Sequence, residues 1–344
     1  MNVADFDYAL PPEAIAQEPA ERRDGSRLLV VDRGRRTWTD RRFADLPGLL
    51  RPGDCLVLND SRVVPARVTA RQSPGGAEIE LLFVSARTPT RWDVLARPAR
   101  RVRTGARLAV AGGACVFRVV ELGEAGSRVV ESESGDVLPL LEHYGSLPLP
   151  PYIARYATPG VIDRERYQTV YAEPPGSVAA PTAGLHFTRA LLDELRARGV
   201  EIHALTLHVG PATFRPIRAA RVEDHRLAPE QARVPVVVAD AANRARAAGR
   251  RILAVGTTTA RALEAAVDGA GRVRPLDGPV GLYITPGHRF AVVDALLTNF
   301  HLPRSSLLVL VAAFAGRELI LDAYRHAIAA GYRFYSYGDA MLIA

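Results

Sequence analysis

The amino-acid sequence predicts an α/β fold that carries a strand-rich insert, and two observations predict it. Between Arg62 and Glu133, six strand-like runs follow one another without a helical period, as in a small antiparallel barrel or sandwich. From Thr188 onward, apolar strand-like runs alternate with helical ones, which is typical of an α/β sheet. The length of 344 residues allows one large domain or two smaller ones.

The expected elements fall into three stretches along the chain. The first stretch has a short helix near residues 43–50 and strands at residues 28–32, 37–41 and 55–58. The insert has strands at residues 63–71, 77–84, 91–97, 106–110, 115–122 and 127–133. The third stretch has helices at residues 188–198, 239–248, 258–267 and 317–330, and strands at residues 202–209, 252–255, 280–284 and 307–312.

Arginine supplies all of the basic side chains, because the chain contains no lysine. This excludes a Schiff-base lysine and a Walker-type phosphate loop, which both need an ε-amine. Ten arginines and three acidic residues lie between Arg62 and Val110, and this excess equals the net charge of +7 of the whole chain. The insert therefore offers either a contact surface for an anionic partner or a solvated basic face.

Cysteine use and apolar runs indicate the compartment. Cys55 and Cys115 stand in no C-x-x-C pattern, so we expect neither a disulfide framework nor a thiolate metal site. The longest apolar stretch, residues 307–315, is about half the length of a membrane span. The acidic N-terminus lacks the features of a signal peptide. We expect a soluble cytoplasmic protein.

A segment rich in glycine, proline and small residues, 176–187, is the first candidate for a ligand site. It contains Thr182, Gly184 and His186, and its backbone can approach a ligand closely. The alternative is a connecting loop that ends in the helix cap Thr188.

Four other motifs lie at expected strand ends or turns. His208 ends a strand, where α/β sheets bind ligands, although a lone histidine there is more often structural. The turn at Gly256, Thr257 and Thr258 leads into a helix and suits a carboxylate or phosphate, or is only a threonine-rich cap. The remaining two motifs, residues 59–62 and 298–303, are either active-site walls or plain turns; they contain Asn59, Asp60, Arg62, Asn299 and His301.

Taken together, these segments resemble the S-adenosylmethionine:tRNA ribosyltransferase-isomerase family of queuosine biosynthesis. The resemblance covers essentially the whole chain and follows the family order through residues 5–8, 26–29, 58–63, 148–153, 167–172, 178–187, 207–210, 255–258, 297–303 and 337–341. It implies a larger α/β domain with an inserted, roughly six-stranded antiparallel β-barrel. We place the α/β catalytic domain at residues 1–61 and 148–344, and the inserted barrel at residues 62–147.

The resemblance also implies a reaction. The ribosyl part of S-adenosylmethionine moves to the aminomethyl group of 7-aminomethyl-7-deazaguanine at the tRNA wobble position. There it is isomerised to the epoxycyclopentane of epoxyqueuosine, with loss of adenine and methionine. S-adenosylmethionine is then a co-substrate, and no metal or tightly bound cofactor is implied. We expect tRNA as the macromolecular partner, no membrane association, and a monomer.

This chemistry needs a base beside the sulfonium, an acid for the departing adenine and a pocket for a zwitterionic amino acid. The candidate proton carriers are His186, His208, Asp224 and His225. The candidate substrate-binding residues are Asn59, Asp60, Arg62, Thr182, Gly184, Gly256, Thr257, Thr258, Asn299 and His301. Within this set, residues 256–258 are expected to hold the methionine carboxylate. Arg100, Arg101 and Arg103 are expected to contact the RNA backbone.

Three positions depart from the family pattern. Ala212 stands where a second glycine is usual, Ala228 replaces a second histidine, and Gly281 replaces a polar residue. These departures leave two alternatives open. One is a divergent paralogue that uses S-adenosylmethionine with a different acceptor, and the other is a non-catalytic RNA-binding protein.

Overall fold

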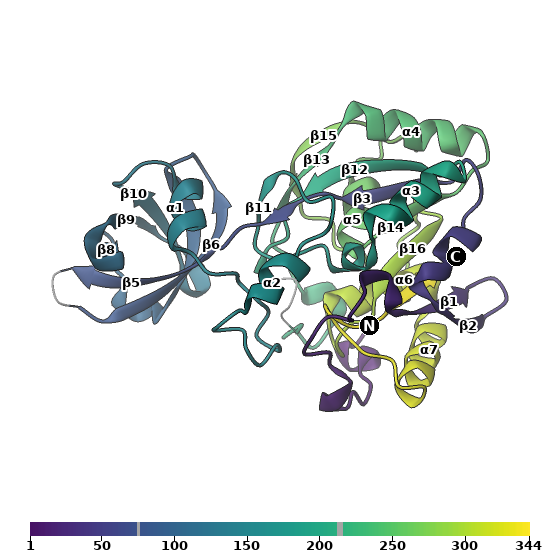
Figure 1. Cartoon of the computed structure of the whole chain (residues 1–344), viewed down its shortest axis with the longest axis horizontal. Helices are drawn as coiled ribbons and strands as arrows, with labels where there is room; N and C mark the ends of the chain where they lie inside the picture. Colours follow the sequence, from purple (N-terminus) through teal and green to yellow (C-terminus); the bar gives the residue numbers. More distant parts are fainter. Residues whose placement is uncertain (74–75, 212–215) are drawn as a thin grey trace. The chain divides into compact units, whose positions relative to one another are not determined.

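The computed structural model describes residues 1–73, 76–211 and 216–344, so Ala212 lies outside the described residues (Figure 1). Its internal contacts form two compact units. The sheet unit comprises Met1–Ser61, Gln168–Glu173 and Pro181–Ala344, and the barrel unit comprises Arg62–Tyr167 and Pro174–Ala180. None of the helices within the described ranges is long and apolar enough to cross a membrane.

The barrel unit extends beyond the predicted insert. We placed the end of the insert at residue 147, whereas residues up to Tyr167 and Pro174–Ala180 also belong to the barrel unit. Arg67 illustrates the reason, because its guanidinium donates to the carbonyl oxygens of Leu149 and Tyr156. The proline-rich run and helix α2 (Val161–Arg166) therefore lie with the barrel.

Six antiparallel strands close into a barrel in the order β10-β7-β6-β5-β8-β9, which confirms the predicted fold class. They are β5 (Arg67–Ser73), β6 (Glu78–Ala86), β7 (Arg91–Arg97), β8 (Arg107–Val110), β9 (Cys115–Leu122) and β10 (Ser127–Ser132). Alternate residues of β6 are fully buried in the core, as the pleat requires. Helix α1 (Val137–Tyr144) packs on this core through Val137 and Leu141.

The first predicted barrel strand is divided in two. Pro65 has no N–H to donate, and it separates β4 (Arg62–Val63) from β5. β4 pairs instead with β11 (Pro175–Ser177) in a small parallel sheet.

The sheet unit is built on nine strands in the order β15-β13-β12-β3-β14-β16-β17-β1-β2. They are β1 (Arg27–Asp32), β2 (Thr37–Arg42), β3 (Cys55–Asn59), β12 (Glu201–Leu207), β13 (Glu230–Val234), β14 (Ile252–Val255), β15 (Leu276–Val280), β16 (Ala295–Asn299) and β17 (Ala340–Ile343). Neighbours β12, β3, β14 and β16 are parallel, so their carboxyl ends share one edge. β17 is antiparallel to β16 and parallel to β1, so the chain enters β1 and β17 at that same edge.

Helices cover both faces of this sheet. On one face, α3 (Arg189–Ala197) and the 3₁₀ helix η4 (Phe43–Gly48) share an apolar core with Leu56 and Leu253. On the other, α4 (Val236–Ala247) and α5 (Thr257–Ala265) contact β3 and β14 (Figure 1). Helices α6 (Ser306–Ala315) and α7 (Arg317–Ala329) pack on each other.

Two predicted strands are wrong. Residues 307–312 belong to helix α6, where the Ser305 hydroxyl accepts a hydrogen bond from the N–H of Leu308 at 3.2 Å and caps the N-terminus. Because α6 is buried on nearly all sides, its sequence shows no amphipathic period. Residues 281–284 are irregular after β15, since the Arg261 guanidinium takes the carbonyl oxygens of Val280 and Leu282.

Candidate functional site

The parallel strands of the sheet unit bring the polar motifs to one edge. Asp60 follows β3, His208 follows β12, Gly256 follows β14, and Asn299 ends β16. Because these four strands are neighbours in the order β12-β3-β14-β16, residues far apart in sequence meet at their carboxyl ends. This is the edge at which α/β sheets bind ligands.

Asn59 joins three of these segments. Its Nδ2 donates to the Leu207 carbonyl at 2.9 Å and to Thr258 Oγ1 at 3.4 Å. Its Oδ1 accepts from the N–H of Leu207 at 3.0 Å and of Ser61 at 3.1 Å. Both ends of the amide are occupied by protein groups, so Asn59 positions its neighbours.

Asp60 is partly buried, and its side chain has one hydrogen-bond partner among the described residues. One carboxylate oxygen, Oδ1, accepts a hydrogen bond from the Thr206 hydroxyl at 2.7 Å. Burial, together with the charge of Glu173, raises the pKa of Asp60 against the opposing effect of that hydrogen bond. The carboxyl group therefore takes up a proton more readily than an exposed aspartate does, which suits proton transfer.

His208 is the strand-end residue with the surroundings of a base. Its Nδ1 is buried and has no hydrogen-bond partner in the described part of the chain. Burial lowers the pKa of His208, so the imidazole stays neutral at neutral pH and keeps an available lone pair.

A buried ion pair fixes the backbone that follows His208. The Arg261 guanidinium donates to Glu230 Oε2 at 2.6 Å, and Glu230 Oε1 accepts from the N–H of Gly210 at 2.8 Å. The Arg261 and Glu230 side chains are only 3% and 8% exposed. The pair thus ties α5 and β13 to the turn after β12.

His186 has both ring nitrogens engaged. Nδ1 lies 2.8 Å from Ser26 Oγ, and Nε2 lies 3.2 Å from Asn299 Nδ2. Asn299 Nδ2 also faces the carbonyl oxygens of Tyr335 and Asp339, so it is the donor and Nε2 accepts. Nδ1–H then donates to Ser26.

The environment of His186 keeps it neutral. Burial, and then the charges of Arg333 and Arg23, lower the pKa of His186 to about 3. Its ring stacks on Phe43 with 5.0 Å between centroids. We predicted proton transfer for His186, but this arrangement favours a role in positioning the 3₁₀ helix η8 (Thr182–His186).

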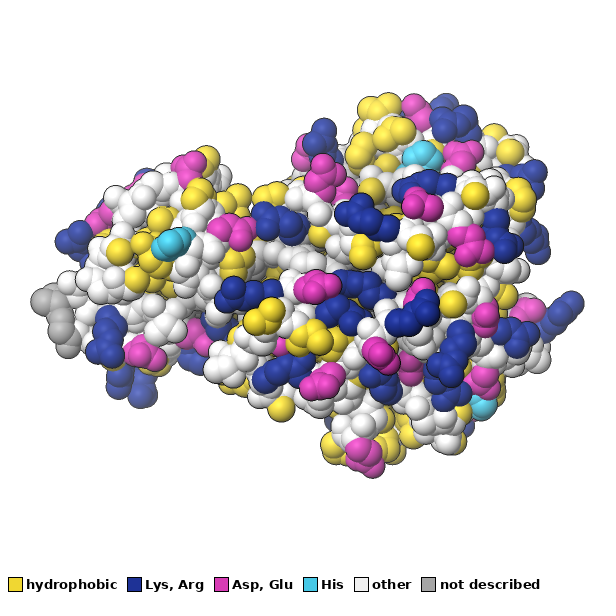
Figure 2. Space-filling view, in the orientation of Figure 1, with side chains coloured by type: hydrophobic (Ala, Val, Ile, Leu, Met, Phe, Trp, Pro, Cys, Tyr) yellow, Lys and Arg dark blue, Asp and Glu magenta, His cyan; other side chains and the backbone are white. Residues whose placement is uncertain are grey.

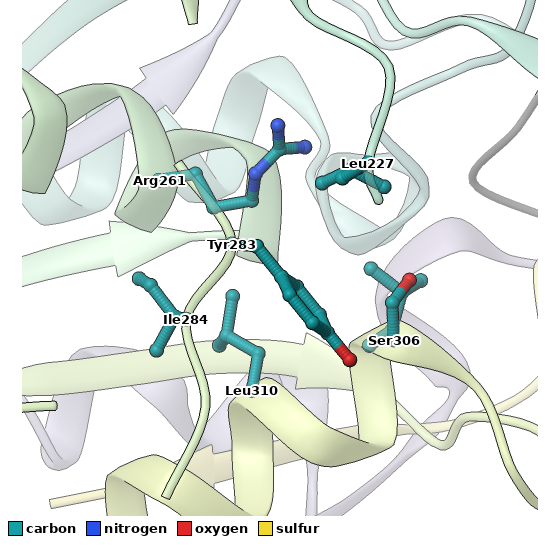
Figure 3. Close-up of a pocket in the computed structure, with 7 residues that line it drawn as sticks. Leu227, Arg261, Tyr283, Ile284, Ser306 and Leu310 are labelled. Carbon is teal, nitrogen blue, oxygen red and sulfur yellow. The ribbon is translucent and has the colours of Figure 1, made fainter. Parts of the chain in front are cut away.

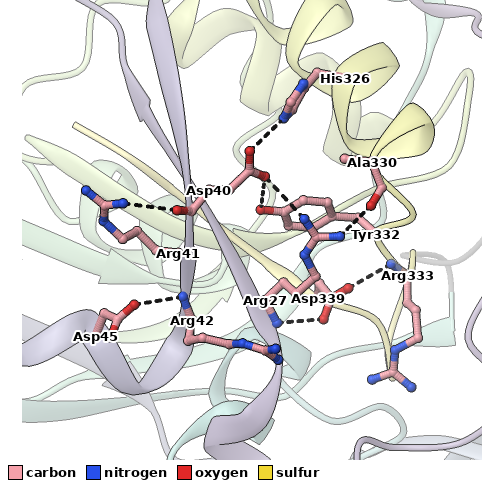
Figure 4. Close-up of polar contacts among 10 residues, drawn as sticks. All are labelled: Arg27, Asp40, Arg41, Arg42, Asp45, His326, Ala330, Tyr332, Arg333 and Asp339. Atoms are coloured by element: carbon pink, nitrogen blue, oxygen red, sulfur yellow. Dashed lines mark hydrogen bonds and ion pairs between the residues drawn. The ribbon is translucent and has the colours of Figure 1, made fainter.

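Asp339 holds the two chain segments that enter β1 and β17. Its carboxylate accepts from the N–H of Arg27 and of Arg333, each at 2.8 Å (Figure 4). Asp339 is 3% exposed, so these hydrogen bonds are shielded from water. They fix the backbone whose Asp339 carbonyl faces Asn299, the residue that contacts His186.

Known proteins match the chain along its whole length. A family model described as queuosine biosynthesis protein matches residues 3–343. The chain belongs to the queuosine biosynthesis protein family. A Moorella thermoacetica S-adenosylmethionine:tRNA ribosyltransferase-isomerase is 49% identical, with 100% of both chains covered. A Thermus thermophilus protein of the same name is 53% identical, with 98% of each chain covered.

A solved structure agrees with this family assignment. The crystal structure of the S-adenosylmethionine tRNA ribosyltransferase from Thermotoga maritima is 37% identical, with a TM-score of 0.56. The match covers 99% of this chain and 100% of that one. Neither alternative, a paralogue with a different acceptor or a non-catalytic RNA-binding protein, finds support in these relatives.

His301 and Gly256, which lie in two of the family motifs, shape the local backbone. His301 Nε2 lies 2.8 Å from Thr298 Oγ1, and burial lowers the pKa of His301 to about 3. Gly256 has a φ of +90° and precedes α5, a conformation that favours glycine. Thr257 and Thr258 are buried in the first turn of that helix.

Asp224 and His225 lie away from the strand ends, near a small pocket that Tyr283 lines. Asp224 is exposed at the end of η10 (Val222–Asp224), and the His225 ring packs edge-on against Tyr283 at 5.3 Å. Tyr283 crosses a small pocket toward Ser306 (Figure 3); the pocket is lined by Leu227, Arg261, Tyr283, Ile284, Ser306, Leu307 and Leu310. Across the described ranges, no hydrogen bond or ion pair joins Asp224 or His225 to the strand-end residues.

Two departures from the family pattern fall on neighbouring backbone. Ala228 is exposed in an irregular segment, and a Cβ added at Gly281 would lie 3.6 Å from Cγ of Pro229. Positions 228 and 281 thus belong to one local region beside this pocket, because Pro229 directly follows Ala228.

The remaining predicted residues divide between the two units. Arg62 lies in the barrel unit, where its guanidinium pairs with Glu142 at 2.8 Å. Thr182 and Gly184 lie in η8 of the sheet unit. Gly184 contacts a residue that our site prediction omitted, Tyr171, although residues 167–172 are part of the family resemblance. No group of three or more potential metal ligands occurs among the residues that the structure describes.

Proposed function

We propose that this chain acts as an S-adenosylmethionine:tRNA ribosyltransferase-isomerase and that S-adenosylmethionine binds at the carboxyl edge of the sheet unit. The observation that carries the proposal is the joint placement of Asp60 and His208 at that edge in a member of the queuosine biosynthesis family. The full-length relatives named for this reaction support the activity.

Two residues take the proton-transfer steps in this proposal. His208, kept neutral by burial, removes the proton from the carbon beside the sulfonium. Asp60, whose pKa burial raises, protonates the departing adenine. The N-terminal turn of α5, at Gly256, Thr257 and Thr258, holds the methionine carboxylate.

The experiment for the activity is adenine release. S-adenosylmethionine is incubated with an anticodon stem-loop that carries 7-aminomethyl-7-deazaguanine, and with the same stem-loop carrying guanine. We expect adenine, and epoxyqueuosine in the RNA, only with the deazaguanine. No adenine with either RNA would reject the proposal.

We propose that one loop of the barrel unit contacts the RNA. Many barrel arginines are neutralised by acidic neighbours, as in the pairs Arg91–Glu131 at 2.7 Å and Arg107–Glu133 at 2.6 Å. On the face shown in Figure 2, basic and acidic side chains are interspersed. On the loop after β7, three exposed arginines form no ion pair within the described residues; they are Arg100, Arg101 and Arg103. Arg71 on β5 and Arg97 at the end of β7 are also exposed and unpaired within these residues, but only the loop brings three such arginines together.

The Arg128 side chain holds the loop that carries these arginines. The Arg128 side chain, in a residue only 9% exposed, donates to the carbonyl oxygens of Val102 at 2.9 Å and Ala99 at 2.7 Å. Val102 is buried in the barrel core, while the arginines on either side of it are exposed. A fixed loop with unneutralised guanidinium groups suits a phosphate backbone.

Replacing Arg100, Arg101 and Arg103 together with alanine is therefore expected to weaken tRNA binding. Log K falls with log salt, and each lost phosphate contact makes this negative slope shallower by about 0.7–0.9. Binding is measured by fluorescence anisotropy across a salt series. The matched control is the triple replacement of Arg91, Arg107 and Arg118, which are paired with glutamates. Equal loss in both triple variants would reject this placement.

Three predictions from the sequence complete the proposal. We place the enzyme in the cytoplasm and expect a monomer that has no tightly bound cofactor or metal. Size-exclusion chromatography with light scattering and metal analysis of the purified protein test the last two.

A further inference from the structure

A short strap of chain lies beside Asp60. Residues Gln168–Glu173 belong to the sheet unit, although the chain before and after them belongs to the barrel unit. We call Gln168–Glu173 the strap. The N–H of Glu173 donates to the Asp60 carbonyl at 2.9 Å, and Val170 and Tyr171 pack on the apolar core of η4 and α3.

Tyr171 of the strap lies directly on the backbone of η8. A Cβ added at Gly184 would lie 2.1 Å from the Tyr171 hydroxyl and 2.9 Å from Cγ2 of Thr169. Heavy atoms that are not bonded to each other do not approach this closely, so only glycine allows the Tyr171 hydroxyl to occupy this place. Gly184 therefore has a specific task within the glycine-rich segment, which is to make room for Tyr171.

The Tyr171 hydroxyl is buried, yet it has no hydrogen-bond partner within the described ranges. The same is true of Thr169 Oγ1 in the strap and of Ser61 Oγ, next to Asp60. Buried hydroxyls are rarely left without a partner, because their desolvation is then uncompensated. Three such atoms on the strap and on the residue after Asp60 indicate a place where an absent molecule supplies the partners.

The charges near Tyr171 determine whether its hydroxyl can donate a hydrogen bond to a ligand. Burial and then the charge of Asp60 raise the pKa of Tyr171, so the phenol keeps its proton and is a hydrogen-bond donor. Arg23, whose charge acts on Tyr171 and His186, donates from Nη1 to the Leu185 carbonyl at 3.1 Å. A ligand here meets the phenol as a donor, the Asp60 carboxyl group and a nearby guanidinium.

We propose that the Tyr171 hydroxyl donates a hydrogen bond to an oxygen or nitrogen acceptor of S-adenosylmethionine, which makes Tyr171 a substrate-binding residue. This inference rests on the proposed function, since it adds a contact within the same donor site. The strap then belongs to that site, although the chain on both sides of it lies in the barrel unit.

The test compares Tyr171→Phe with Tyr332→Phe. The Tyr332 hydroxyl donates a hydrogen bond to Asp40 Oδ1 at 2.6 Å (Figure 4). Tyr332 is therefore a tyrosine whose hydroxyl already has a partner. The probe is S-adenosylhomocysteine, and calorimetry measures its Kd. We expect Tyr171→Phe to weaken binding about tenfold, as for one net hydrogen bond, and Tyr332→Phe to leave it unchanged.

Thermal unfolding of the free proteins gives a second readout. Tyr171→Phe removes an unpartnered buried hydroxyl and should leave Tm unchanged or raise it, whereas Tyr332→Phe breaks a hydrogen bond and should lower Tm. A structural tyrosine at position 171 would instead lower Tm and leave the Kd unchanged, and this result overturns the inference.

A second probe locates the contact. 5′-Methylthioadenosine lacks the amino-acid part, so equal loss with both probes assigns the contact to the adenosine half. Loss with S-adenosylhomocysteine alone assigns it to the amino-acid half. If the unmodified protein binds neither probe, the proposed donor site fails and this inference fails with it. If the unmodified protein and Tyr171→Phe bind both equally, only the inference fails.

Discussion

Replacing His208 with glutamine lowers the rate of adenine release by about 10²–10⁴-fold, the usual contribution of a general base, and leaves the Kd of S-adenosylhomocysteine unchanged. Glutamine keeps most of the volume and polarity of histidine but cannot accept the proton. The expectation rests on the unpartnered Nδ1 of His208 and on its place at the end of β12. Single-turnover kinetics with the modified stem-loop measure the rate of the chemical step.

The matched control for His208 is His203, which lies on the same strand. His203 Nε2 is 3.4 Å from a carboxylate oxygen of Glu201, near the start of β12 and away from its carboxyl end. His203→Gln should leave the rate close to that of the unmodified enzyme. Similar losses for the two variants would show that the strand tolerates neither change and would remove the evidence for His208 as the base.

The pH dependence gives an independent check on His208. Burial lowers the pKa of His208 below the ordinary 6.5, and a base is active only above its pKa. Protonation of His208 should therefore lower the rate only below about pH 6.5, which defines the acid limb of this residue. This acid limb should be absent from the residual activity of His208→Gln. An acid limb of unchanged midpoint in the variant would assign it to another group.

The second large effect concerns stability. Arg261→Met should lower the free energy of unfolding by about 3–5 kcal/mol, because it removes the guanidinium that pairs with the buried Glu230 carboxylate. The Glu230 side chain is 8% exposed, so water cannot replace the guanidinium. Arg261 also donates to the Val280 and Leu282 carbonyl oxygens, and these bonds are lost as well. Urea unfolding followed by circular dichroism measures the change.

An exposed ion pair provides the control for Arg261. Arg274 pairs with Asp268 at 2.6 Å, but the two side chains are 57% and 24% exposed. Arg274→Met should therefore cost less than about 1 kcal/mol. Equal shifts of the urea midpoint in the two variants would mean that burial of the Arg261–Glu230 pair does not increase its contribution to the free energy of unfolding.

The strands that carry the site could be predicted where a polar or glycine turn follows a short apolar run, as at β3, β12 and β14. The sequence pattern does not predict β16, because residues 295–299 are completely buried and show no alternation. The sequence of helix α6 resembles that of a strand for a related reason, since burial on nearly all sides removes the helical period. Complete burial removes the alternation, so such a strand is predicted only where a turn signal follows it, as at the fully buried β3 and β14.

The roles of the site residues depend on contacts that no local pattern contains. His186 and His208 look equivalent in the sequence, yet His186 is held by Ser26 and Asn299, which lie 160 and 113 residues away. Tyr171 gains its importance only through its contact with Gly184. The basic stretch is a further case, because cross-strand register places Arg91 opposite Glu131 and so cancels its charge.

The central claim is that the donor substrate binds at the carboxyl edge formed by β12, β3, β14 and β16. A crystal structure of the chain with S-adenosylhomocysteine tests it most directly. We predict density for the ligand at this edge, with the Tyr171 hydroxyl within about 3.5 Å of a ligand acceptor and with His208 facing the sulfur end. Density in the pocket of Tyr283 and Arg261, with the edge empty, would contradict the claim.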